Sequence, residues 1–297
     1  MCDLLCALPA ATGGATLFAK NSDRPPGERQ VLEWHPPRVD RERTHATHIS
    51  IAAHPAKTLG VLGSRPTWGW GLEHGVNEAA VAAGNATIYT TLDPRPFPDA
   101  LTGMDLVRLA LERGSTAAEA VSVIQELLAT VGQGGSGHEG ARRPYWSSFL
   151  VADPSAAYLL ETSGAECAVE EVDRVRATSN RTTIPAFDTA HRHRGQPVER
   201  LVDARWHASQ DVLDREPVTV DALKEHLESH VGGDDGWTVC MHVATGDHEE
   251  RTNAALVAEL PVTGRPTAHV TTGPPCTARW HRIPVAPPTD GAWPNVR

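Results

Sequence analysis

The feature that most constrains this chain is a hairpin with a polar end at its very start. Two short apolar runs, residues 4–8 and 15–19, are joined by a segment that ends in paired glycines. Paired glycines permit positive φ angles and a tight reversal, so the two runs are predicted to pair as antiparallel strands. We therefore expect Lys20 and Asp23, which follow the second run, to lie near the thiol of Cys2.

Cys2 is chemically special because removal of Met1 leaves one residue that carries both a thiol and an α-amine. A free α-amine titrates at about 8, so part of it is neutral at cellular pH and accepts the thiol proton. This arrangement predicts acyl transfer. The alternative is a packing role, since most cysteines near a chain start are small buried hydrophobes. Cys6, inside the first apolar run, is assigned to packing.

The charge balance argues against a polyanionic partner. The chain has 27 Lys and Arg residues against 37 Asp and Glu residues, a net charge of -10 and a pI of about 5.8. Nucleic acids and anionic membrane surfaces attract basic proteins, so neither is expected as a partner. We expect a small-molecule or dipeptide substrate, and the sequence also allows a homo-oligomer.

Cysteine usage and apolar patterning favour a cytoplasmic location. Five cysteines form an odd set without close metal-type spacing, and no charged-then-apolar leader precedes the first predicted strand. No apolar run approaches the about 18 residues that span a bilayer. With 297 residues, 40% of them apolar, and no clear boundary, the chain is expected to form a single domain over 1–297.

Strands and helices follow the first hairpin in blocks. Helical periodicity covers 105–113 and 116–131, and in the second helix Thr116 and Glu119 predict a capping box and Gly132 a C-cap. Strands are predicted at 48–53, 59–62, 81–85, 145–152, 157–162, 167–172, 238–242, 249–258 and 268–273, with a turn at 75–78 and a helix at 219–231. Grouped hairpins with helices between them favour an α+β sandwich over a parallel doubly wound fold.

Metal chemistry is disfavoured by the spacing of the histidines and cysteines. His191 and His193 lie in a charged segment that is typical of a solvated helix and loop. A zinc hydrolase built on Cys240, His242 and His269 is the least favoured hypothesis, because the spacing matches no zinc signature. We expect neither a metal nor a cofactor.

Many ordered motifs together resemble the secernin and C69 dipeptidase family. The resemblance runs from the first residue to about Thr272. It rests on Cys2-Asp3, on the segments 18–25, 64–71, 75–78, 103–113, 132–135 and 148–153, and on Leu160-Glu161-Thr162. Motifs in this number and order are far more specific than one short pattern.

The resemblance implies an N-terminal nucleophile hydrolase. This fold is a four-layer αββα sandwich in which two antiparallel sheets lie between helix layers. Enzymes of this type cleave carbon-nitrogen amide bonds, and bacterial C69 members are described as dipeptidases, whereas the activity of animal secernins is less settled. The family therefore indicates the chemistry better than the substrate.

Three catalytic roles follow from the resemblance. Cys2 is the nucleophile, with its α-amine as the base. Asp23 orients or charge-stabilises that amine. Asn85 donates a hydrogen bond to the developing oxyanion, a contact whose loss typically costs about 10² to 10³ in rate in other enzymes. Considered singly, Asp23 could be a turn residue and Asn85 a strand-end residue.

Three further residues match more loosely. Lys20 occupies the place where related bile salt and penicillin V acylases carry an Arg near the nucleophile. Asn180 resembles the second polar residue of those acylases, and Arg251 resembles their distal Arg. These matches predict that all three lie at the catalytic centre.

Aromatic residues are the candidates for the substrate pocket. Trp68 and Trp70 lie between glycines, where they either line a pocket or fill a gap in the core. Tyr89 and Trp146 are the other candidates for lining an acyl or side-chain pocket.

Processing of the start of the chain decides whether this mechanism operates. Many members of the family carry a longer leader that is removed by autocatalysis, whereas only Met1 precedes Cys2 here, which favours activation by removal of methionine. Two alternatives stay open. One is a dedicated biosynthetic amidase or acyltransferase, in which an amine replaces water in deacylation. The other is a non-catalytic regulatory protein that keeps the fold.

Overall fold

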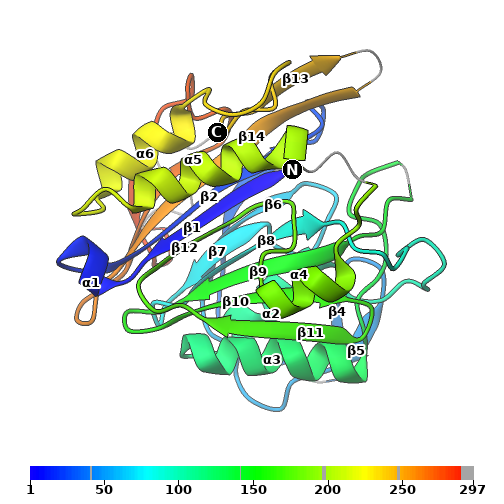
Figure 1. The fold of residues 1–297 in the computed structure, drawn as a ribbon. Helices are drawn as coiled ribbons and strands as arrows, with labels where there is room; N and C mark the ends of the chain where they lie inside the picture. The colour runs from blue at the N-terminus through cyan, green and yellow to red at the C-terminus, as the bar shows by residue number, and fades with distance from the viewer. Residues whose placement is uncertain (41, 141, 196–198, 246–247, 289–297) are drawn as a thin grey trace.

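Two β-sheets stacked face to face form the centre of the protein. The computed structural model describes residues 1–40, 42–140, 142–195, 199–245 and 248–288 (Figure 1). Each sheet has seven strands, all strand pairs within it are antiparallel, and helices cover its outer face. The α+β class and the αββα sandwich predicted from the sequence are confirmed.

The first sheet contains the predicted N-terminal hairpin at its centre. In spatial order its strands are β12 (Val175–Thr178), β1 (Cys2–Ala7), β2 (Thr16–Arg24), β14 (His248–Leu260), β15 (Thr267–Thr271) and β16 (His281–Pro284), and β13 (His242–Thr245) also pairs with β14. The second sheet consists, in spatial order, of β11 (Glu166–Glu171), β10 (Ala157–Ser163), β9 (Trp146–Ala152), β8 (Ala82–Ile88), β7 (His74–Asn77), β6 (Val61–Pro66) and β3 (Gln30–His35).

Different helices cover the two sheets. The helices α5 (Ala204–Leu213) and α6 (Val220–Glu228) contact the first sheet through β1, β2, β12 and β14. The helices α2 (Gly103–Arg113) and α3 (Ala117–Thr130) contact β7 to β10 of the second sheet. The remaining elements are α1 (Pro9–Thr12), α4 (Pro185–His191), the π-helical turn η1 (Glu199–Asp203), and a separate two-stranded sheet of β4 (Arg43–His45) and β5 (Ser50–Ala52).

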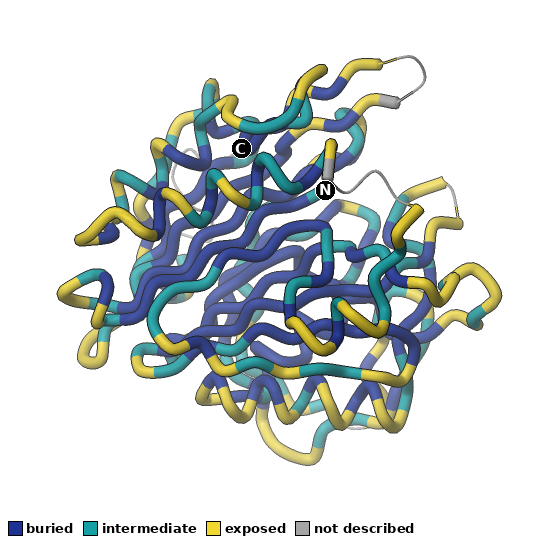
Figure 2. The backbone as a smooth tube through the Cα atoms, in the orientation of Figure 1, coloured by how far each residue is buried: buried dark blue, intermediate teal, exposed yellow. Residues whose placement is uncertain are grey.

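Three apolar cores lie between the four layers, and β1 contributes to two of them. Leu4 and Cys6 point into the core between the sheets, whereas Leu5 and Ala7 point toward α5 and α6. This alternation is the period of two expected of a strand, and the whole of β1 is buried because a layer covers each face (Figure 2). Cys6 is fully buried, as the packing assignment predicted.

The second helix of the α2–α3 pair is capped almost as predicted. The Thr116 side chain accepts a hydrogen bond from the backbone amide of Glu119, but the carboxylate of Glu119 accepts from Ser115. The reciprocal capping box is found instead at α2, between Thr102 and Asp105. Gly132 follows the α3 C-cap with a φ of 87°, a left-handed conformation that suits glycine.

Several boundary predictions were wrong, because glycine and proline were interpreted as turn signals. Residues 75–78 were predicted to form a turn, but β7 runs through Gly75, where an added Cβ would lie 2.8 Å from the Leu62 carbonyl oxygen. Glycine there permits close packing of strands. The hairpin loop contains the helical turn α1 rather than a simple reversal.

Two predicted strands also lie elsewhere than expected. The segment 48–53 contributes only β5, in the separate small sheet, and 238–242 is loop up to the start of β13. The segment 175–178 crosses to the first sheet and pairs with β1. Within the described ranges, no helix combines the length and apolar character needed to cross a membrane.

Candidate active site

Cys2 lies at the start of β1, in the wall of a cavity of about 230 Å³. It pairs with Ser22 across the hairpin and is 6% exposed. The cavity is lined by Met1, Cys2, Asp23, Arg24, Glu73, Asn85, Ala86, Thr87, Tyr89, Gly137, His138, Arg143, Pro144, Tyr145 and Glu250. The hairpin thus brings the thiol to a cavity that contains charged groups of both signs.

Lys20 is the cation nearest to the thiol. Its Nζ lies 3.3 Å from Cys2 Sγ, 2.7 Å from Ser22 Oγ and 3.2 Å from Glu73 Oε2. Burial raises the pKa of the Cys2 thiol, and the positive charge of Lys20 opposes that rise. Burial alone would lower the pKa of Lys20, but Cys2 and Glu73 outweigh it and raise that pKa. The pair is therefore set up so that the ammonium stabilises a thiolate.

Glu73 and Arg24 extend this charged network, and neither was predicted as a site residue. Arg24 Nη1 lies 3.0 Å from Glu73 Oε1, and its Nη2 forms an ion pair with Glu28 and donates to the Gly137 carbonyl at 2.6 Å. The loop after α3 is thereby attached to the end of β2. Arg24 follows directly on the predicted polar end of the hairpin, so its place in the sequence was the available signal.

Asn180 holds the backbone nitrogen of Cys2. The Cys2 N–H donates to Asn180 Oδ1 at 2.8 Å, and Asn180 Nδ2 donates to the Thr87 carbonyl at 2.8 Å. Arg205 Nη2 donates to the same Oδ1 at 3.2 Å, and Arg205 Nη1 pairs with Asp3 Oδ2 at 2.6 Å. Arg205 and Asp3 are fully or almost fully buried and were not predicted. The structure thus places Asn180 beside Cys2, at the position predicted for it.

Asp23 lies behind the start of β1 and is held by strand β14. Its Oδ1 accepts a hydrogen bond from Thr252 Oγ1 at 2.6 Å, and its Oδ2 lies 4.0 Å from Arg205 Nη1. Within the described ranges, Asp23 Oδ2 has no hydrogen-bond partner. Burial raises the pKa of Asp23 to about 7, although the N-terminal ammonium and Arg205 lower it.

A register shift in β14 lies beside this carboxylate. Thr252 pairs with Asp23, but Ala254 pairs with the next residue of β2, Ser22, so Asn253 is an extra residue in the ladder. Asn253 Nδ2 donates to the carbonyl groups of Pro25 and Glu28, at 3.0 and 2.9 Å. The bulge thus serves two purposes, since it presents Thr252 to Asp23 and fixes the segment after β2.

Met1 continues the ladder of β1 by one residue and occupies part of the cavity. The Asp23 amide donates to the Met1 carbonyl at 2.9 Å, and the Met1 ammonium lies 3.2 Å from both the Asp23 carbonyl and Glu250 Oε2. Burial alone would lower the pKa of this ammonium, but Glu250, Cys2 and Asp23 outweigh it and raise that pKa. While Met1 is attached, the nitrogen of Cys2 is an amide and has no basic lone pair.

Asn85 projects from β8 into the same cavity as Cys2. It is 3% exposed, and its Oδ1 has no hydrogen-bond partner within the described ranges. The start of α2 packs closely on it, since a Cβ at Gly103 would lie 2.5 Å from Asn85 Nδ2. The side chain is therefore closely packed, its Oδ1 can only accept a hydrogen bond, and its Nδ2 is the group that can donate.

The remaining predicted residues lie farther from the thiol. Arg251 is exposed and bonds to Asn253 Oδ1 and the Pro26 carbonyl, whereas the arginines buried near Cys2 are Arg24 and Arg205. Trp70 is not among the residues that line the cavity. Its ring centroid lies 4.0 Å from the guanidinium carbon of Arg108.

Trp68 lies behind Arg24 and not against Cys2. Its Nε1 donates to Glu28 Oε2 at 3.2 Å, and its ring centroid lies 5.8 Å from the Arg24 guanidinium carbon. Two of the four aromatic candidates, Trp68 and Trp70, thus support neighbouring arginines.

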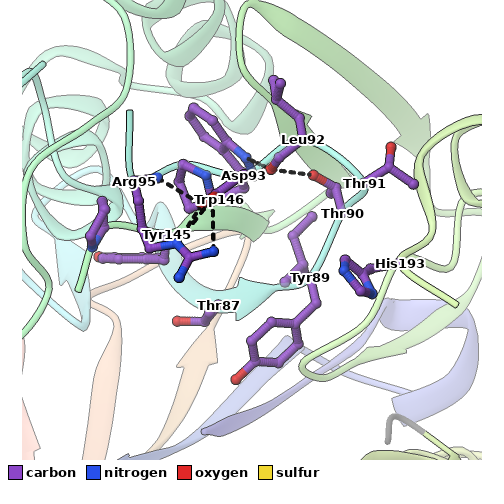
Figure 3. Close-up of a pocket in the computed structure, with 13 residues that line it drawn as sticks. Thr87, Tyr89, Thr90, Thr91, Leu92, Asp93, Arg95, Tyr145, Trp146 and His193 are labelled. Carbon is purple, nitrogen blue, oxygen red and sulfur yellow. Dashed lines mark hydrogen bonds and ion pairs between the residues drawn. The ribbon is translucent and has the colours of Figure 1, made fainter. Parts of the chain in front are cut away.

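Tyr89 and Trp146 line a second cavity of about 310 Å³ (Figure 3). Trp146 is almost fully buried, and its Nε1 donates to the Leu92 carbonyl at 2.8 Å. The two cavities share the lining residues Thr87, Tyr89, Pro144 and Tyr145. Tyr89 and Tyr145 therefore separate a polar cavity at Cys2 from a less polar one beyond it.

The residues of the sequence-derived zinc hypothesis are not all brought together. His269 Nε2 pairs with Glu259 Oε1 at 2.9 Å on the adjacent strand, whereas Cys240 and His242 lie in and beside β13. His191 pairs with Glu166 at 3.2 Å. These groups lie outside the residues that line the Cys2 cavity.

Comparison with solved structures shows the same fold in two enzymes. A variant of the conjugated bile acid hydrolase from Clostridium perfringens is 12% identical, with a TM-score of 0.60 over 95% of this chain and 92% of that one. Penicillin V acylase from Agrobacterium tumefaciens is 16% identical, with a TM-score of 0.59 over 95% of this chain and 86% of that one. No protein-family model matches the chain, and membership of the secernin and C69 family stays a prediction.

Proposed function

We propose that this protein, once Met1 is removed, is a cysteine amidohydrolase that cleaves a carbon-nitrogen amide bond through a thioester on Cys2. One observation carries the proposal. Cys2 Sγ lies at a cavity wall 3.3 Å from Lys20 Nζ, while the nitrogen of the same residue is held by Asn180 at 2.8 Å. The nucleophile and the held nitrogen thus belong to one residue, and the stabilising cation lies next to it.

Acylation begins with transfer of the thiol proton to the α-amine of Cys2. Sγ then forms a bond to the substrate carbonyl carbon, and the carbonyl π electrons move to the oxygen. Asn85 lines the Cys2 cavity, and its Nδ2 is the group that donates to that oxyanion. When the C–N bond breaks, its electron pair stays on nitrogen and takes the proton from the α-ammonium, which leaves an acyl group on sulfur.

Deacylation repeats these steps with water. The α-amine accepts a proton from water, the hydroxide oxygen bonds to the thioester carbon, and the C–S bond breaks to leave a thiolate beside Lys20. Asp23, with its Oδ2 directed toward Arg205 and the chain start, orients the α-amine and balances its charge when protonated. Asn180 Oδ1 keeps the amine in position in both half-reactions.

The cavities indicate a small substrate. About 230 Å³ at Cys2 and about 310 Å³ beyond Tyr89 and Tyr145 suit a dipeptide or a small N-acyl compound. Arg143 lines the polar cavity and is exposed, so it is available to a substrate carboxylate. The names of the two enzymes with this fold, an acylase and a hydrolase of conjugated bile acids, also support amide hydrolysis.

Mass spectrometry and a substrate panel test the proposal. We expect the active protein to lack one Met mass, to be alkylated at Cys2 by iodoacetamide, and to release product from dipeptides or N-acyl amino acids. A matched chain with a stable extension in front of Met1 retains the fold and is inactive. Turnover at an equal rate by the extended chain would refute the role of the α-amine.

The same assays identify the acyl acceptor, water or an amine, and test whether the protein is an enzyme. An acyltransferase would give acyl-amine product in excess of free acid when a small amine is added, whereas a hydrolase gives free acid. A regulatory protein would show neither product nor an acyl adduct on Cys2 across the panel.

A further inference from the structure

We propose that His230, Cys240, His242 and Cys276 form a structural zinc site, separate from the Cys2 cavity. One side-chain ligand atom from each of these four residues can be chosen so that all four lie within 4.8 Å of one another. The site shares no residue with the lining of the catalytic cavity. It would therefore add a metal ion to a protein whose sequence indicated none.

The distances between the ligand atoms fit a tetrahedral ion. With Zn–S bonds of about 2.3 Å and Zn–N bonds of about 2.0 to 2.1 Å, neighbouring ligand atoms of a tetrahedron lie about 3.3 to 3.8 Å apart. His242 Nε2 lies 3.5 Å from Cys240 Sγ and 3.2 Å from Cys276 Sγ. The His230 ring centroid lies 5.1 Å from that of His242, which brings a fourth ligand to the same point.

The kinds of ligand at this site determine which metal ion is preferred and what role it has. Two thiols and two imidazoles at tetrahedral spacing favour zinc over the oxygen-loving cations magnesium and calcium. Four protein ligands close the coordination sphere, which is typical of a structural site rather than a catalytic one. Cys240 is buried and Cys276 is half-buried, whereas His230 and His242 are exposed, so an ion has a path from solvent.

The four ligands come from three segments of the chain. His230 follows α6, Cys240 and His242 lie at the start of β13, and Cys276 lies in the turn between β15 and β16. The chain runs from α6 to β13 over the top of the first sheet (Figure 1). Cys240 already bonds through its amide to the Ser229 carbonyl, at 2.8 Å. A bound ion would join the Cys276 turn to this pair of segments.

The zinc site would also support the catalytic carboxylate from behind. Met241, between the ligands Cys240 and His242, exchanges two hydrogen bonds with Thr252, at 2.9 and 3.1 Å. Thr252 Oγ1 in turn donates to Asp23 Oδ1. The ion would thus hold the segment that positions Thr252, and it would take no part in the reaction at Cys2.

The first test measures the metal content of the intact protein as purified. We expect about one zinc per chain after purification without chelator. Cobalt substitution should give the visible bands of a tetrahedral ion and a near-ultraviolet thiolate-to-metal band. Removal of the ion by a chelator should lower the melting temperature, and added zinc should restore it.

Single substitutions locate the site. Cys276→Ser, in a half-buried turn, should weaken zinc binding by at least about 100-fold, and His230→Ala should do the same. Cys167→Ser is the matched control, because Cys167 is also half-buried but lies on β11, in the other sheet, and should retain full zinc content.

Any of three results would overturn the proposal. The first is a folded wild-type protein that binds neither zinc nor cobalt at micromolar concentration. The second is zinc content that is unchanged in both Cys276→Ser and His230→Ala. The third is a Cys240–Cys276 disulfide in protein purified from its natural compartment. The wild-type titration settles the question even if a variant fails to fold.

Discussion

The two ends of the inner face of strand β1 carry the same side chain in opposite surroundings. Cys2 and Cys6 both point between the sheets and both are buried. Around Cys6 the layer is apolar, and burial with the charge of Asp153 raises its thiol pKa to about 12. At Cys2, Lys20 Nζ lies 3.3 Å from the sulfur and opposes the effect of burial.

The difference shows that the layer between the sheets is apolar at the Cys6 end of β1 and charged at the Cys2 end. Cys2 and Cys6 are four residues apart on the same face of β1. Cys6 is a packing group, whereas Cys2 lies beside a cation, a carboxylate network and a cavity. A thiolate is the reactive form of cysteine. Reactivity is therefore expected only at the end of β1 where the second sheet supplies Glu73 to keep Lys20 charged and fixed.

Removal of each thiol by substitution with alanine should give the largest contrast. In the processed protein, Cys2→Ala is expected to reduce kcat by at least about 10⁴-fold, because no covalent intermediate forms. Cys6→Ala should leave kcat within about twofold and lower the free energy of unfolding by about 1 to 2 kcal/mol. Steady-state kinetics and urea unfolding measure both, and a Cys2→Ala protein with wild-type turnover would remove the basis of the comparison.

Removal of the cation should make the Cys2 end resemble the Cys6 end. Lys20→Met is expected to raise the pKa of the Cys2 thiol and to lower kcat by about 10² to 10³, as for loss of other charged stabilisers. The pH dependence of iodoacetamide alkylation measures the thiol pKa directly. Lys57→Met, on an exposed position, is the control and should change neither quantity. Equal alkylation profiles for both variants would contradict the role of Lys20.

Asp23 should make the reactive end sensitive to pH near neutrality. Its pKa is raised to about 7 by burial, so the carboxyl is protonated and neutral below that pH and charged above it. If the charged form orients the α-amine, kcat/KM rises with pH through about 7 and falls about tenfold per unit below it. In Asp23→Asn this inflection should vanish, and only the titration of the α-amine should remain. An unchanged inflection would assign it to another group.

The smallest effect is expected at the rim of the cavity. Arg143→Gln should raise KM by about fivefold for substrates with a free carboxylate and leave kcat unchanged, because an exposed charge pair contributes about 1 kcal/mol. Arg142→Gln is the neighbouring control, since Arg142 bonds to the carbonyl groups of Arg95 and Phe97. Measurement with an acid and its amide analogue separates charge recognition from general binding.

Local patterns in the sequence were sufficient for much of the fold. The hairpin of β1 and β2, the helices α2 and α3, and most strands of the second sheet follow from periodicity and turn residues. The short strands β3, β4 and β16 were missed because their residues do not alternate clearly. The crossing of β12 to the first sheet is a tertiary pairing that no local pattern encodes.

In the candidate site too, residues placed by local structure were predicted, whereas residues placed by partners far away in the sequence were missed. Lys20 and Asp23 were predicted next to Cys2 because the hairpin register fixes them there. Arg205 and Glu73 were missed, because a charged residue reads as exposed unless its partner is known, and each is buried by an ion pair distant in sequence. At the proposed zinc site, Cys240 and His242 were considered as ligands together with His269, whereas His230 and Cys276 were missed because they come from other parts of the chain.

The extra residue Asn253 in β14 makes the length of this strand part of the site. Side chains of a strand alternate between its two faces, so a shift by one residue exchanges the faces. Loss of the extra residue, Asn253, would turn Thr252 away from Asp23. Relatives of this protein are thus expected to tolerate many exchanges of residue type next to the bulge but to keep the extra residue, which gives a reference position for aligning distant sequences.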